Sequence, residues 1–122
     1  MILPAALAAA LATTLGLAMA APAQTNADRE AWRLDVATAH VALVEARACG
    51  LAADTVGRAL GYINGRLVTL AASRGIRPRE AEPIVRESTI AAAALPPPRP
   101  GKARSAEVVP IVQAWAAGRD GG

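Results

Sequence analysis

The sequence predicts a small all-α protein: a three-helix arrangement after a signal peptide, then a proline-rich linker and a short C-terminal helix. An uncharged apolar run occupies residues 2–23, later segments carry apolar side chains at helical spacing, and Gly or Pro separates those segments. We therefore expect four regions: a signal peptide (1–23), a helical domain (24–95), a proline-rich linker (96–104), and a short C-terminal helix with a mobile tail (105–122).

The first segment has the composition of an export signal. No charged residue occurs between Ile2 and Ala23, and small-x-small cleavage sites end at Ala20 and at Ala23. We expect cleavage after Ala23, so that the mature chain is periplasmic or secreted. The alternative is an uncleaved N-terminal helix that anchors the protein, because about 20 apolar residues can span a hydrocarbon core.

The first helix of the mature chain is expected over residues 27–49. Asp28 lies in its first turn, where the helix dipole favours anions, and Gly50 is suited to a left-handed C-cap. Two apolar sectors predict that this helix is contacted on two sides. The first sector contains Trp32, Val36, Ala39 and Leu43, and the second contains Leu34, Val41 and Val44.

The second helix is expected over residues 54–74, with Asp54 as N-cap and Gly75 as the stop. A seam of large apolar residues follows helical spacing and comprises Val56, Leu60, Ile63, Leu67 and Leu70. A β-hairpin with its turn at Asn64–Gly65 is the competing interpretation. Strict apolar alternation is missing on both flanks, which favours the helix.

Small residues occur at every fourth position of this second helix, and Gly57, Gly61 and Gly65 are the central members of the row. Each interior glycine costs a helix about 1 kcal/mol relative to Ala, so the repetition indicates a packing benefit. Either a helix of the same chain packs closely on the row, or the row is a groove for a partner. We expect Gly61→Leu to overpack the row and to destabilise the fold.

The third helix is expected to begin at Pro83, although Pro78 also suits a first turn, and to end before Pro96. After the linker, Pro110 is expected to start a short helix that ends at Gly118, followed by a mobile tail over residues 119–122. The apolar residues of this short helix either fold back onto the other helices or dock on a partner. They are Ile111, Val112 and Trp115.

One sector of the first helix carries a basic stripe, formed by Arg29, Arg33, His40 and Arg47. Such a stripe is suited to a phosphate, a lipid headgroup or an acidic partner, which allows peripheral membrane contact. A solvated helix edge, with Arg stems over apolar surface, is the competing interpretation.

Cys49 cannot form an internal disulfide, because it is the one cysteine of the chain. It is either packed under a helix corner, free, or bonded to another chain. Its spacing of nine residues from His40 points the two side chains in opposite directions on one helix, so the pair does not form a metal or nucleophile-base site. We expect no metal and no cofactor.

These observations favour a noncatalytic protein that associates with a protein partner or with itself. A binder of anionic small molecules or lipid headgroups is the alternative, and a covalent dimer through Cys49 is a second one. No carboxylate pair, nucleophile-base pair or phosphate loop supports an enzyme. A net charge of +3 with three aromatic side chains gives only weak support for nucleic-acid binding, and we expect no nucleic-acid partner.

Overall fold

The computed structural model describes residues 26–96 and 103–121, and all regular elements in these ranges are helices. They are α1 (Asn26–Ala48), α2 (Ala53–Ser73), α3 (Pro78–Ala93) and α4 (Ala103–Ala116). The predicted all-α class is confirmed, and α2 continues through Asn64–Gly65 without a hairpin. The predicted signal peptide and most of the predicted linker lie outside the described residues.

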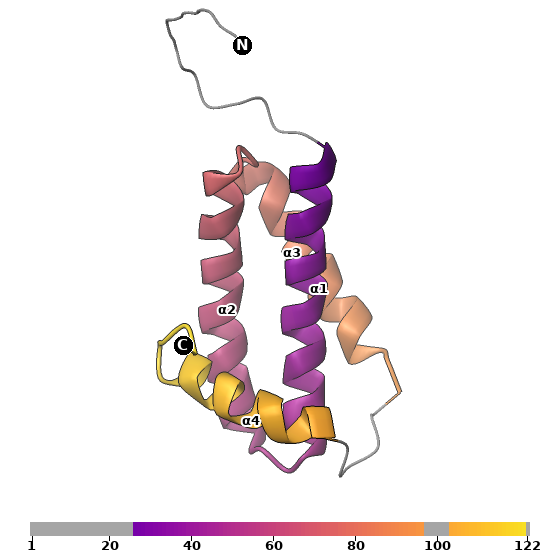
Figure 1. Cartoon of the computed structure of the whole chain (residues 1–122), viewed down its shortest axis with the longest axis vertical. Helices are drawn as coiled ribbons and strands as arrows, with labels where there is room; N and C mark the ends of the chain where they lie inside the picture. Colours follow the sequence, from indigo (N-terminus) through magenta and orange to yellow (C-terminus); the bar gives the residue numbers. More distant parts are fainter. Residues whose placement is uncertain (1–25, 97–102, 122) are drawn as a thin grey trace, which may run out of the picture.

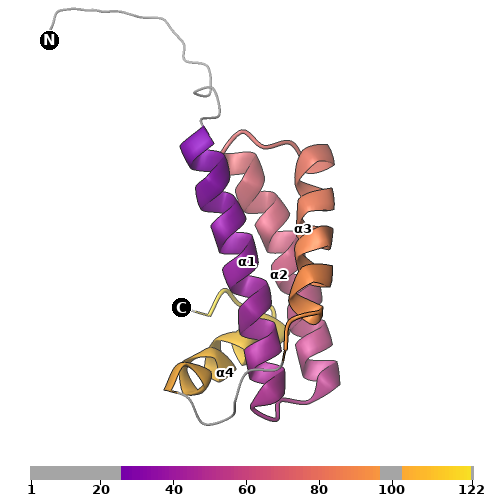
Figure 2. The ribbon, with the colours of Figure 1, turned by 90° about the vertical axis from the view of Figure 1, so that its right-hand side faces the viewer.

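The helices α1 and α2 form a central antiparallel pair that is covered on two opposite faces (Figure 1). The third helix packs along one face, and α4 crosses the other face near the α1–α2 loop (Figure 2). Among the described residues, α4 contacts α1 and α2 but not α3. The α1–α2 pair is therefore contacted from both sides, as the two apolar sectors of the first helix predict.

Glycines end three of the helices, as the sequence predicts. Gly50, Gly75 and Gly118 have φ angles of 99°, 78° and 79°, which side chains with a Cβ rarely adopt. The N–H of Gly75 donates to the Ala72 carbonyl, and the N–H of Ile76 donates to the Ala71 carbonyl. This is the Schellman arrangement, which satisfies carbonyls that a helix end leaves free. Equivalent bonds occur at the other two glycines.

The core follows the predicted apolar stripe of α1 and a shifted stripe of α2. Trp32 is fully buried, and its Nε1 donates to the Leu67 carbonyl at 2.9 Å. The buried residues of α2 are Ala59, Ile63, Leu67 and Ala71. The prediction that Leu34 and Leu70 belong to apolar packing faces is wrong, because Leu34 is 67% exposed and Leu70 is 38% exposed. Val56 and Leu60 are partly buried against the core, so Leu70 is the member of the predicted seam that lies outside it.

Two predicted helix starts are wrong, and proline is the reason in both cases. The third helix begins at Pro78, and Pro83 lies inside it; the last helix begins at Ala103, and Pro110 lies inside it. Proline lacks the N–H that would bond the carbonyl four residues earlier. Those carbonyls belong to Arg79 and Ala106, which are exposed, so water can bond them. Asp54 is also not the N-cap of α2, because Ala52 occupies that position.

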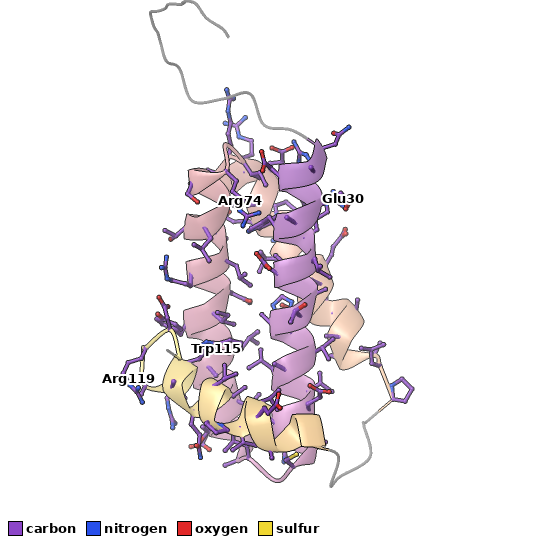
Figure 3. The ribbon with its side chains drawn as sticks, viewed as in Figure 1. Glu30, Arg74, Trp115 and Arg119 are labelled. Carbon is purple, nitrogen blue, oxygen red and sulfur yellow. The ribbon has the colours of Figure 1, made fainter. Side chains whose placement is uncertain are left out.

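The last helix completes the core. Val108, Val112 and Trp115 are at most 8% exposed and lie at helical spacing. Trp115 points from α4 toward α2 (Figure 3). Of the two alternatives for this segment, Val112 and Trp115 therefore follow the first and fold back onto the other helices, whereas Ile111 is 36% exposed. The segment folds back because its apolar face meets the uncovered face of the α1–α2 pair.

The described part of the predicted mobile tail is held in place. Both carboxylate oxygens of Asp120 accept from Arg66 Nε, at 3.0 and 3.2 Å, and the Tyr62 hydroxyl also donates to Asp120. The Arg66 guanidinium, followed by the Tyr62 hydroxyl, lowers the pKa of Asp120, and the bond to Asp120 raises the pKa of Tyr62. Arg119 lies at the outer edge of this C-terminal turn (Figure 3).

Candidate binding groove

A buried histidine links three helices at the middle of the bundle. His40 of α1 is 2% exposed, although the sequence places it on a basic stripe. Its Nδ1 lies 2.7 Å from Ser88 Oγ on α3, and its Nε2 lies 2.7 Å from Asn64 Oδ1 on α2. Thr89 Oγ1 on α3 lies 3.2 Å from the same Nε2. A buried polar side chain is stable only when it is hydrogen-bonded, and here both ring nitrogens are.

One neutral tautomer of His40 satisfies the whole cluster. With the proton on Nε2, the ring donates to Asn64 Oδ1 and accepts from the Ser88 hydroxyl at Nδ1. The Thr89 hydroxyl donates to the Val85 carbonyl at 3.0 Å, so its oxygen is free to accept. We therefore assign the Nε2–H tautomer from the hydrogen-bond partners.

The line from Ser88 through His40 to Asn64 has the order of a nucleophile, a base and an orienting group. Its surroundings differ from those of a hydrolytic site. Ser88 lies inside α3, where backbone N–H groups are bonded within the helix, and it does not line either groove described below. The cluster therefore ties the three helices together.

An apolar groove of about 500 Å³ lies between α1, α2 and α3, next to this cluster. His40 and Thr89 lie at one end of the groove, and Arg47 lies on α1 two turns further along. The groove is lined mainly by aliphatic side chains and small residues, which are Leu43, Val44, Ala48, Ala53, Val56, Gly57, Leu60, Ala92, Ala93 and Leu95. Pockets of this size and composition hold small molecules in many proteins.

Two members of the glycine row line grooves, and within the described residues the row packs against no helix. A Cβ placed on Gly57, Gly61 or Gly65 would meet nothing within 4 Å among the described residues. Close packing within the chain is therefore a wrong prediction for this row. Gly57 lines the groove beside His40, and Gly65 lines a second groove of about 470 Å³ between α2 and α3. The missing side chains leave space along the α2 edge that faces α3.

The predicted basic stripe is the edge of α1 that faces α3. Arg29 forms an ion pair of 2.6 Å with Glu80 of α3, and His40 bonds Ser88 of the same helix. Arg33 is exposed. Arg47 lines the groove and donates to the Leu51 carbonyl at 3.4 Å. The four residues therefore do not form one anion site, because α3 covers the stripe at His40.

Sequence reasoning missed the polar partners of His40. Asn64 lies beside the apolar seam of the second helix, and Ser88 and Thr89 lie one turn after Ile84 and Val85 of the third helix. A polar side chain next to an apolar helix face is the signal that could have found them. The sequence does not show that three such positions meet at one histidine.

Cys49 is exposed, so the prediction of a thiol packed under a helix corner is wrong. It lies at the C-cap of α1, where the chain turns toward α2 and leaves the side chain outside the core. Within the described ranges, no three His, Cys, Asp or Glu side chains converge as metal ligands would. None of the described helices combines the length and apolarity that a membrane span requires.

The fold and groove define the class: a small all-α protein with an apolar groove between three of its helices. No protein-family model, curated protein or solved structure matches the chain. Its function must therefore be argued from the groove.

Proposed function

We propose that this protein is a noncatalytic binding protein that holds a small apolar or amphipathic molecule in the groove between α1, α2 and α3. The observation that carries the proposal is the aliphatic lining around about 500 Å³ of space. Ligand pockets commonly have volumes of about 300 to 1,000 Å³ and few polar groups. The groove fits this description, with His40, Thr89 and Arg47 as its polar members.

Binding without reaction follows from the hydrogen bonds of the polar members. Both ring nitrogens of His40 and the hydroxyl hydrogen of Thr89 are already used within the protein. Ser88 does not line the groove. The groove therefore presents contact surface rather than an activated nucleophile.

The place of action belongs to the same proposal. The uncharged run at residues 2–23 and the small-x-small site at Ala23 support export and cleavage of a signal peptide. We place the mature binding protein in the periplasm or outside the cell. A comparison of the masses of the expressed precursor and of the exported protein tests this step.

The groove is tested by filling it at a position where the fold has room. In Gly57→Leu, the new side chain would occupy the groove, and its Cβ would meet no atom within 4 Å. Gly61→Leu is the matched control, because Gly61 has the same free space and does not line the groove. Binding is followed by the fluorescence of anilinonaphthalene sulfonate, an apolar probe with a sulfonate group.

We expect the wild type and Gly61→Leu to bind the probe with equal affinity. Gly57→Leu should bind the probe at least tenfold more weakly. Thermal melts of the three proteins show whether each is folded. Equal binding by Gly57→Leu and wild type would contradict the proposal, as would the absence of binding to folded wild type.

Association with a protein partner or with a second copy is the alternative proposal. Of the surfaces that the sequence suggests for it, the glycine row is open in the structure, and Gly61 faces solvent. Sedimentation analysis of wild type and Gly61→Leu tests this alternative. If wild type is a dimer and Gly61→Leu is a monomer, the alternative is supported. If both proteins are monomers, self-association through this row is ruled out.

A further inference from the structure

We infer that the ligand of the groove is an anionic amphiphile, with a medium-length alkyl chain along the aliphatic lining and a carboxylate at Arg47. This inference rests on the proposed function and names the chemical class of the ligand. It follows from where the charge, the apolar surface and the already-bonded polar groups lie along the groove.

The charge of the groove has one sign. Arg47 is the one residue among the lining side chains that carries a fixed charge, and no Asp or Glu lines the groove. Four other arginines form ion pairs, which are Arg29–Glu80, Arg58–Asp54, Arg66–Asp120 and Arg74–Asp35. No carboxylate of the described part of the chain pairs with Arg47. An anion placed beside Arg47 would therefore meet a guanidinium that no described carboxylate neutralises.

The first turn of α2 lies at the same end of the groove. Its first residue, Ala53, lines the groove, and its N-cap, Ala52, has no side-chain hydrogen bond to the turn. The partial positive charge of a helix N-terminus adds to that of Arg47. The Asp54 carboxylate in this turn is bonded to Arg58 at 3.3 Å. The groove and Arg47 carry the inference, and the helix end supports it.

The opposite end of the groove does not call for a charged group. His40 and Thr89 use their polar hydrogens within the protein, so an alkyl end can lie against them without leaving a donor unbonded. His40 and Arg47 are seven positions apart, which is about 10 Å along the helix. Leu43, Val44 and Leu60 line the space between the two ends. A medium-length alkyl chain fits this length better than a compact anion.

The test uses three probes of equal chain length: decanoate, decanol and decyltrimethylammonium, each below its micellar concentration. Calorimetry measures their affinities for wild type, Arg47→Gln and Arg33→Gln. Arg33→Gln is the matched control, because it removes one exposed positive charge from the same helix outside the groove.

We expect wild type to bind decanoate up to about fivefold more tightly than decanol, the upper end of what an exposed ion pair contributes, and to bind decyltrimethylammonium most weakly. Arg47→Gln should remove the advantage of decanoate and leave decanol unchanged, whereas Arg33→Gln should change neither. Added salt should weaken decanoate binding alone.

The outcomes separate the inference from the proposed function. Equal binding of decanoate and decanol, or an undiminished decanoate advantage in Arg47→Gln, would overturn the anionic class while the groove remains a binding site. If none of the three probes binds the folded protein, the proposed function fails together with the inference.

Discussion

The Nδ1 atom of His40 lies 2.7 Å from the Ser88 hydroxyl oxygen, and this contact joins the middle of α1 to the middle of α3. Through its other nitrogen, the same ring reaches Asn64 of α2. One side chain thus connects three helices at the end of the groove. The shape of the groove therefore depends on the His40 cluster.

Replacement of His40 by Ala should destabilise the protein by about 3 kcal/mol, because it leaves polar partners unbonded in a partly buried site and opens a cavity. Thr38→Ala, at an exposed position of the same helix, should change stability by less than about 0.5 kcal/mol. Urea unfolding measures both. A His40→Ala protein as stable as wild type would show that the cluster does not hold the helices together.

Replacement of Trp115 by Ala should cost about 3 to 5 kcal/mol, as for other buried aromatic residues, because Trp115 packs in the common core. Ile111→Ala should cost less, since Ile111 is 36% exposed. Thermal unfolding followed by circular dichroism compares the two variants. If Trp115→Ala unfolds at the same temperature as wild type, α4 is not part of the cooperative core.

Gly61→Ala should stabilise the protein by about 0.5 to 1 kcal/mol, because Ala has the higher helix propensity and its Cβ meets no neighbour within 4 Å. This reverses the expectation, drawn from spacing alone, that larger residues overpack the row. The midpoint of urea unfolding gives the change. A destabilised Gly61→Ala protein would mean that something does approach the row, in the chain or in an oligomer.

The Asp120 contacts should make the C-terminal turn sensitive to acid. The Arg66 guanidinium and the Tyr62 hydroxyl lower the pKa of Asp120 from its ordinary value of 3.8. A carboxyl group with a lowered pKa in the folded state stabilises fully above its ordinary pKa, and this contribution disappears as the pH falls through the lowered pKa. Wild type should therefore be more stable than Asp120→Asn at neutral pH, and the difference should vanish in acid.

Urea unfolding of both proteins across the acidic range measures this difference. High salt should reduce the difference at neutral pH, because the ion pair is exposed. A difference that is constant from neutral to strongly acidic pH would show that the carboxylate charge is not its source.

The helix ends were predictable because they depend on neighbours in sequence. Gly75 and Ile76 end α2 by donating hydrogen bonds to the carbonyls of Ala72 and Ala71, so every partner lies within six residues of sequence. A Gly followed by an apolar residue is therefore enough to recognise the motif. The starts of α3 and α4 were harder to predict, because proline does not always mark the start of a helix. A helix can contain an interior proline when water bonds the carbonyl that loses its N–H partner.

The groove was not predictable from spacing, because it depends on which helix faces which. Arg29, His40 and Arg47 share one sector of α1, and the sequence does not reveal that α3 lies against that sector. The regular spacing of the glycines correctly marked one edge of α2 as unusual. Whether the edge is filled or open is decided by the distance to α3, which is a tertiary property.

The proposed function depends on the entry of a ligand into the groove between α1, α2 and α3. Titration of ¹⁵N-labelled protein with decanoate, followed residue by residue by NMR, tests it most directly. We expect saturable shifts of the amide signals of Leu43, Arg47, Gly57 and Leu60, which line the groove, with small changes at Gly61 and on α4. Shifts centred on α4 or on Gly61 and Gly65, or no saturable shifts at all, would contradict the proposed site.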